Sequence, residues 1–191
     1  MAHSFSPADA SDLKAVLGLF REASAWHRKI GAEEWPEFEE ERVFDDIRHG
    51  RLYVLREDGS IVGSVTVTES DPLIWDDDNG ALYIHRLTVS RTSAGRRLGL
   101  SILENVKSLA RVSGRRLLRL DCWANNHRLK EYYRRVGFKD AGTRHVGDEE
   151  SLPLHYQNST TAKFELYIGD DTDRSRLIDG PLQTKTTSSA V

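Results

Sequence analysis

The stretch 81–123 constrains the fold of this chain more than any other part of the sequence. Residues 81–89 are rich in apolar and β-branched side chains, which is typical of a strand. Apolar residues then recur at helical spacing over about residues 95–112, and Gly114 ends this pattern. Residues 117–123 are again mostly apolar, as in a strand that is buried in a sheet. A strand, a helix and a second strand in this order predict a parallel pair of strands with a right-handed crossover.

The remaining segments predict mainly antiparallel pairing. Residues 52–55 form an apolar run, Asp58 and Gly59 carry the signal of a hairpin turn, and residues 61–68 form the partner strand. Further strands are predicted at residues 5–8, 138–145 and 162–168, and further helices at residues 11–29, 39–49 and 126–136. The fold class is therefore α/β, with a mixed, mostly antiparallel sheet of about six to seven strands flanked by about four helices.

Length and cysteine content exclude several classes of protein. A chain of 191 residues suits one domain, which we expect over residues 1–168, followed by a polar C-terminal tail over residues 169–191. No apolar run approaches the roughly 20 residues that cross a bilayer, and the first residues do not resemble a secretion signal. The one cysteine, Cys122, excludes an internal disulfide and argues against a thiolate metal site. We therefore expect a cytoplasmic protein that has no metal and no membrane contact.

Residues 94–99 form a short loop of small and basic residues between a predicted strand and the helix that follows it. Gly95 and Gly99 allow backbone N–H groups to turn toward an anion, and the amino end of the helix adds positive potential. Arg96 and Arg97 can supply charge-assisted hydrogen bonds. The glycine spacing fits neither a P-loop nor the dinucleotide-binding fingerprint. On its own, the loop fits an anion site and also fits a plain turn.

A second motif follows the buried strand, and it consists of Asn126, Tyr133, Gly137 and Phe138. The loop and this motif, in this order and on these elements, resemble the GNAT superfamily of acetyl-CoA-dependent acyltransferases. The resemblance covers about residues 3–168, and several further segments resemble an actinomycete-like bacterial branch of that superfamily. The loop departs from the usual pattern, because Ala94 stands where an arginine is common and Arg97 replaces the middle glycine.

The resemblance implies a sheet with a central splay between the strands 81–89 and 117–123, and acetyl-CoA as co-substrate. The pantetheine arm would run along the first of these strands, where backbone groups of Leu87 and Val89 would hydrogen-bond it and one N–H would face the oxyanion. The residues expected to bind the cofactor are Leu87, Thr88, Val89, Ala94, Gly95, Arg96, Arg97, Leu98, Gly99, Asn126 and Tyr133.

The candidate general acid is Tyr133. A phenol with an ordinary pKa of about 10 can protonate a departing thiolate and still keep its proton in the resting enzyme. Its helical spacing alone fits a core tyrosine, and the resemblance favours the catalytic role. Cys122 has no evident partner pair of histidine and aspartate, so we do not expect a nucleophilic cysteine.

The general base has two candidates, Glu69 near the end of one strand and His85 on the next strand. By alternation along that strand, His85 is expected to share a face with Leu87 and Val89. Asp121 ends an apolar run and is interpreted as a structural hydrogen-bonding group.

The acceptor pocket is expected between the first two helices, the connection at residues 71–80 and the last hairpin. Trp26, Trp35 and Trp75 can form aromatic walls there, and ordinary packing explains them as well. The leading hypothesis is direct transfer of an acetyl group to the primary amine of a small molecule. A protein or peptide amine as acceptor and a non-catalytic acyl-CoA-binding regulatory module stay open. A net charge of −3 argues against nucleic acid as a partner, and a homodimer is compatible with the sequence.

Overall fold

A single sheet organises the computed structural model, which describes residues 3–77, 79–147 and 157–169 of the chain. The strands are β1 (His3–Pro7), β2 (Leu52–Glu57), β3 (Ser60–Thr68), β4 (Ala81–Val89), β5 (Leu117–Trp123), β6 (Lys139–Val146) and β7 (Ser159–Tyr167). The helices are α1 (Leu13–Lys29), α2 (Glu40–Arg48), α3 (Leu98–Val112) and α4 (His127–Arg135), with short 3₁₀ turns η1 (Ala10–Asp12) and η2 (Arg91–Ser93).

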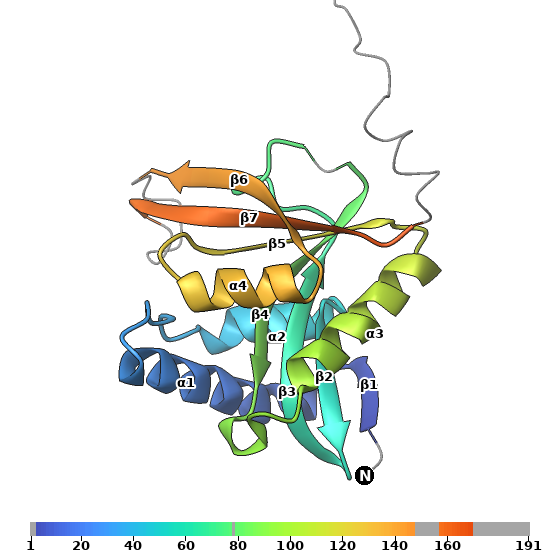
Figure 1. Cartoon of the computed structure of the whole chain (residues 1–191). Coiled ribbons are helices and arrows are strands. Elements are labelled where there is room, and N and C mark those ends of the chain that lie inside the picture. The colour runs from blue at the N-terminus through green and yellow to red at the C-terminus, as the bar shows by residue number, and fades with distance from the viewer. Residues whose placement is uncertain (1–2, 78, 148–156, 170–191) are drawn as a thin grey trace, which may run out of the picture.

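The described strands form a seven-stranded sheet in the order β1-β2-β3-β4-β5-β7-β6. Each neighbouring pair is antiparallel except β4 and β5, which are parallel and are joined through α3. The predicted class, a mixed and mostly antiparallel α/β sheet with about four flanking helices, is confirmed. In Figure 1, β5, β6 and β7 run at a steep angle to β2, β3 and β4.

Helices cover both faces of this sheet (Figure 1). The spacing of apolar residues in α1 and α2 turns one stripe of each helix toward β2, where Val16, Phe20 and Val43 pack on Leu52 and Val54. On the other face, α3 and α4 pack on the larger core, which includes Val65, Val67, Leu82, Ile84, Ile102, Val106, Tyr133 and Phe164.

The two parallel strands separate partway along their length. β4 pairs with β5 only from Ala81 to Ile84, opposite Leu117 to Leu120. Beyond this point β5 continues to pair with β7 as far as Trp123, whereas β4 continues with β3 as far as Val89. The predicted central splay is therefore present, and it begins immediately after Ile84 and Leu120.

A bulge interrupts β4 where the splay begins. The register between β3 and β4 shifts after His85, so that Arg86 and Leu87 together lie opposite one residue of β3. Arg86 has a φ of 49°, in the left-handed region that side chains rarely adopt. Because the bulge reverses the alternation, Leu87 and Val89 pack in the core under α3, while His85 bonds to Thr68 on the face of α1 and α2. The expectation that His85 shares a face with Leu87 and Val89 is wrong for this reason.

Two further expectations concern membrane-spanning segments and the C-terminal tail. Within the described ranges, no helix is both long enough and apolar enough to cross a membrane. The tail predicted at residues 169–191 lies outside the described residues except for Gly169.

Candidate active site

The splay between β4 and β5 opens into a cavity of about 1460 Å³. Its walls come from the separated part of β4, the end of β5, α1 with the segment that leads to α2, and α4. The predicted site residues that line it are Trp26, Trp35, His85, Leu87, Thr88, Val89, Gly99, Asn126 and Tyr133. Glu69, Trp75 and residues 94–98 do not belong to this lining.

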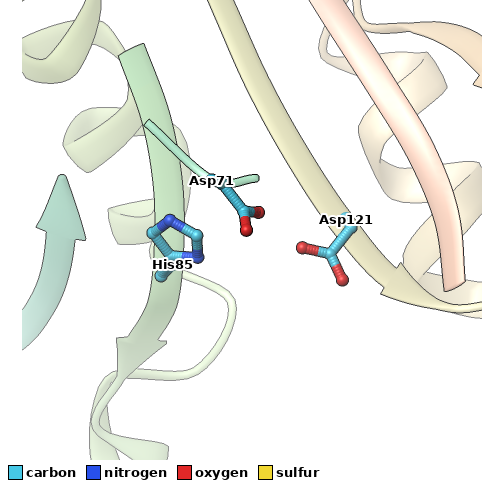
Figure 2. A group of neighbouring side chains, drawn as sticks. All are labelled: Asp71, His85 and Asp121. Carbon is cyan, nitrogen blue, oxygen red and sulfur yellow. The ribbon is translucent and has the colours of Figure 1, made fainter. Parts of the chain in front are cut away.

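Three titratable side chains from distant parts of the sequence meet where the splay begins. His85 follows the last residue of β4 that pairs with β5, and Asp121 follows the last residue of β5 that pairs with β4. Asp71 comes from the connection between β3 and β4. One ring nitrogen and one oxygen from each carboxyl group all lie within 4.8 Å of one another. Figure 2 shows the imidazole and the two carboxyl groups turned toward a common space.

Burial gives these three groups unusual proton affinities. Burial raises the pKa of Asp121 to about 7, and the neighbouring charge of Asp71 adds to the rise. Burial also raises the pKa of Asp71 to about 6, against the effect of backbone N–H groups that bond to its carboxylate. The pKa of His85 falls to about 4, because burial disfavours its charged form and the guanidinium of Arg86 opposes it too. At neutral pH, the imidazole is uncharged and the two carboxyl groups titrate as a pair.

The hydrogen bonds of Thr68 determine the tautomer of His85. The Thr68 hydroxyl donates its single proton to the Ser70 carbonyl oxygen at 3.0 Å. It must therefore accept a hydrogen bond from His85 Nε2, which lies 3.0 Å away. The neutral ring then carries its proton on Nε2, so that Nδ1 has a free lone pair. In Figure 2 the second ring nitrogen lies on the side of the carboxyl groups.

Tyr133 reaches the cavity from α4. Asn126 caps this helix, because its Oδ1 accepts a hydrogen bond of 3.0 Å from the Leu129 N–H. The Tyr133 side chain packs between the rings of Phe138 and Phe164, with centroids 5.9 Å and 5.6 Å away, and the residue is only 7% exposed. Burial raises the pKa of its phenol well above the usual value, so the hydroxyl keeps its proton and can act as a donor.

Cys122 lines the same cavity but is held as a thiol. Burial raises its pKa to about 12, and the charge of Asp121 contributes to the rise. A thiolate is the nucleophilic form of cysteine, so this side chain is unsuited to form an acyl intermediate.

Two sequence candidates lie away from the cavity. The Glu69 side chain is 75% exposed and forms an ion pair of 3.0 Å with Arg115, beyond the end of α3. Trp75 is buried in a separate cluster, where its ring packs against Tyr83 and lies 4.2 Å from the Arg119 guanidinium. Their local sequence could not reveal this, because Glu69 and Trp75 contact Arg115 and Arg119, which are distant in the sequence.

The loop before α3 has a left-handed backbone at Arg97, where the family pattern has a glycine. Arg97 caps α3 with a φ of 58°, and Gly95 has a φ of 80°. The Arg96 guanidinium pairs with Glu57 on the β2–β3 hairpin. Gly99 allows a close approach to α4, because a Cβ at this position would lie 3.1 Å from the Tyr132 hydroxyl oxygen.

The structure brings three further residues to the site or its rim: sequence reasoning missed Asp71 and Arg91, and it interpreted Asp121 as a structural group. Asp71 and Asp121 belong to the titratable cluster, and the Arg91 guanidinium lies 3.9 Å from the centre of the Trp26 ring at the cavity wall. The position of Asp121 directly after a buried apolar run was a usable signal. The connection that carries Asp71 offered none.

Comparison with known proteins identifies the family. The sequence matches the model of the Acetyltransferase (GNAT) family over residues 19–138, which is more than half of the chain. The chain belongs to the acetyltransferase (GNAT) family. This acetyltransferase is also 29% identical over 158 residues to the uncharacterized N-acetyltransferase YesJ of Bacillus subtilis (strain 168), a match that covers 75% of the chain and 88% of YesJ. It is an N-acetyltransferase.

Solved structures of GNAT proteins share the fold of this acetyltransferase. A GNAT-family acetyltransferase from Listeria monocytogenes 4b F2365 is similar with a TM-score of 0.67 and 21% identity, over 86% of this chain and 95% of that one. The yncA protein of Salmonella typhimurium, solved with its cofactor acetyl-CoA, is similar with a TM-score of 0.65 and 13% identity, over 89% of this chain and 96% of that one.

Proposed function

We propose that this N-acetyltransferase moves an acetyl group from acetyl-CoA to the primary amine of a small molecule by direct transfer. The observation that carries the proposal is one cavity at the β4–β5 splay, lined by a proton donor, Tyr133, and by proton acceptors, His85 and Asp121. Acetyl transfer to an amine needs both kinds of group, because the amine must lose protons and the departing thiolate must gain one.

The open edge of β4 and the start of α3 form a suitable binding surface for acetyl-CoA. Beyond Ile84, no described strand pairs with the edge of β4 that faces β5, so backbone N–H and C=O groups near Leu87 and Val89 are available to the pantetheine arm. At the end of this edge, Gly99 lets the first turn of α3 come close to its neighbours. Positive potential at this helix end suits the phosphate groups. The cofactor supplies the activated acetyl thioester.

The residues at the splay divide the proton transfers between them. His85 Nδ1 and the carboxyl pair of Asp71 and Asp121 accept protons from the amine nitrogen, since Nδ1 has a free lone pair and an ionised carboxyl group is an acceptor. Tyr133 donates its phenolic proton to the leaving sulfur. A backbone N–H of the open β4 edge faces the carbonyl oxygen, and one such donor is worth about 3 kcal/mol in an enzyme of this kind. The buried Cys122 thiol takes no part.

The reaction can be tested directly by mass spectrometry. The full chain is incubated with acetyl-CoA and a mixed panel of small amines and peptides, and each amine is examined for the gain of one acetyl group. We expect acetylation of small primary amines. Acetylation of peptides alone would favour a protein or peptide acceptor, and binding of acetyl-CoA without any acetylated product would favour a regulatory module.

Five finer features are part of the same proposal. The catalytic domain spans residues 1–168 and the polar tail residues 169–191, and the protein works in the cytoplasm without a metal. It comes from an actinomycete-like branch of the family, and a homodimer is compatible with its function. The position of the two family motifs supports the bounds of the domain, and the single cysteine argues against a thiolate metal site.

A further inference from the structure

Among the residues that the structure describes, the carboxyl groups of Asp71 and Asp121 lie together without a positive partner. No arginine or lysine in the described part of the chain lowers the pKa of either group. The guanidinium of Arg86, the basic group next to His85 in the sequence, is paired with Asp46 of α2. Two adjacent, partly buried carboxyl groups without a counter-charge weaken the folded state. The arrangement therefore favours a cation that comes from outside the chain.

The third member of the cluster is an acceptor as well. His85 donates its only ring proton, on Nε2, to the Thr68 hydroxyl, so Nδ1 has a free lone pair. One ring nitrogen of His85 and one oxygen of each carboxyl group all lie within 4.8 Å of one another, and Figure 2 shows a ring nitrogen on the side that faces the carboxyl groups. A primary ammonium carries three N–H donors at tetrahedral angles, and with charge-assisted bonds of about 2.8 Å its three acceptors stand about 4.6 Å apart. The spacing and the number of the cluster's acceptors therefore fit the three N–H donors of one R–NH₃⁺ group.

We propose that Asp71, His85 and Asp121 bind the acceptor substrate as a primary alkylammonium, with each of its three N–H groups donated to one member of the cluster. This inference rests on the proposed acetyl transfer and names the class of its acceptor. The body of the amine lies toward Trp35 and Phe38, which line the cavity on the side of α1 and α2. An acceptor with a carboxylate beside the ammonium is excluded, because the two aspartates repel it.

The bound ammonium also has a path for its protons. One N–H proton passes to the carboxyl pair, which frees the nitrogen lone pair. The nitrogen then forms the C–N bond to the acetyl carbon as the C–S bond breaks, and a second N–H proton passes to His85 Nδ1. The sulfur takes the proton of Tyr133, which recovers one of the two protons released from nitrogen. The net reaction gives an amide, a free thiol and one proton to solvent.

Calorimetry with three probes of equal chain length tests the site. The full chain, with and without CoA, is titrated at about pH 8 with n-hexylammonium, n-hexyltrimethylammonium and 1-hexanol, so that the carboxyl groups are ionised and the amine is still charged. We expect n-hexylammonium to bind at least about tenfold more tightly than either analogue, because a lost charge-assisted hydrogen bond costs about 1.5–3 kcal/mol. Equal binding of the trimethyl analogue would overturn the proposal, since that cation has no N–H donor.

Variants locate the binding to the cluster. Asp71→Asn and Asp121→Asn should each weaken n-hexylammonium at least about tenfold, since each replaces a charged acceptor by a neutral one. Glu104→Gln changes a carboxylate on the outer side of α3, where it pairs with Lys107, and should leave the affinity unchanged. Unchanged affinity in both aspartate variants would refute the site.

Two further measurements separate this inference from its alternatives. Zn²⁺ alone is titrated into chelator-treated protein, and tight zinc binding without n-hexylammonium binding would make the cation a metal and overturn the proposal. Acetylation of n-hexylamine and of N-methylhexylamine is followed by mass spectrometry. Equal acetylation of both would refute the ammonium site and leave acetyl transfer intact, whereas selective binding without any acetylation would refute acetyl transfer and leave the site intact.

Discussion

At the scale of single residues, the proposed acid–base chemistry of the site depends on groups whose burial changes their proton affinity. The same carboxyl group that costs stability when ionised is a strong proton acceptor near neutral pH. Asp121 is the clearest example, since its pKa of about 7 lies well above that of an exposed aspartate. Three predictions belong to this scale.

The pH dependence of kcat/KM should report the carboxyl pair. The ionised form accepts the proton, so kcat/KM should rise with pH up to about 7 and then level off. Asp71→Asn removes a negative neighbour that contributes to the raised pKa of Asp121, so the rising limb should move to lower pH. Rates measured across the pH range check this, and a limb that stays in place in Asp71→Asn would contradict it.

Asp121→Asn should stabilise the fold while it impairs function. The folded-state pKa of Asp121 is above its unfolded value, so the native state holds more protons and its stability falls as pH rises from about 4 to about 7. The variant escapes this loss, and its thermal midpoint should exceed that of the wild type more at pH 8 than at pH 5. Each kcal/mol gained corresponds to about 2–4 °C for a chain of this size. A midpoint lower than wild type at both pH values would refute the assignment.

Tyr133→Phe should lower turnover by about 100-fold to 10,000-fold while acetyl-CoA affinity stays similar. The ring contacts with Phe138 and Phe164 remain, and only the hydroxyl is lost. Tyr53→Phe is the matched control, because Tyr53 lies on β2 and stacks on Phe5, outside the cavity lining. Melting temperatures are measured alongside, and wild-type turnover in a folded Tyr133→Phe variant would make Tyr133 a packing residue.

At the scale of elements, the bulge in β4 and the start of α3 set the geometry of the cavity. The bulge puts His85 on one face and Leu87 on the other. The histidine and the strand edge that we propose for the cofactor therefore occur within three residues of one strand. The loop before α3 adopts the left-handed backbone at Arg97 that a glycine would adopt without strain.

Substitution of Arg97 tests that loop. Arg97→Gly should leave stability unchanged or raise it by up to about 1 kcal/mol, because glycine accepts a positive φ without cost. Arg97→Val should destabilise the fold by about 1–2 kcal/mol, because a β-branched residue is strained in this region. Urea unfolding of both variants measures the difference. Equal stabilities would mean that Arg97 does not hold the left-handed conformation in solution.

At the scale of the whole molecule, the splay leaves the protein open between its two halves of sheet. One half carries α1 and α2, and the other half is β5 with β7 and β6. A cofactor that lies along β4 contacts both halves and should stabilise the folded chain in proportion to its affinity. At a concentration of about 100 times Kd, this stabilisation is about 2.7 kcal/mol.

Gly99→Asp should abolish the thermal shift that acetyl-CoA produces. The side chain would crowd the Tyr132 hydroxyl and would add negative charge where phosphate is expected. Gly18→Asp is the matched control, because it adds the same group to α1 at a position with nothing within 4 Å of the added Cβ. Thermal melting with and without acetyl-CoA compares the two. A full shift in Gly99→Asp would contradict the placement of the cofactor.

Much of the architecture could be predicted from local patterns. The crossover from β4 to β5 followed from apolar periodicity, and the family motif placed Asn126 and Tyr133 at the start and inside of α4. These features are local, because helix spacing, strand composition and capping residues depend on neighbours within a few positions. The sequence by itself therefore determined the class of fold, the position of the splay and the acid candidate.

The tertiary structure alone decided which base candidates meet the cavity. Asp71, His85 and Asp121 come from three elements, and only the separation of β4 from β5 brings them within 4.8 Å. The face of His85 was predicted from strict alternation along the strand, and the bulge at Arg86 breaks that alternation. Glu69 forms an ion pair with Arg115 and lies outside the cavity lining. Alternation and charge patterns carry no information about a register shift or a contact between distant segments. The pairing of strands and the position of Asp71 beside β4 and β5 determine those, and with them the proposed acceptor half of the site.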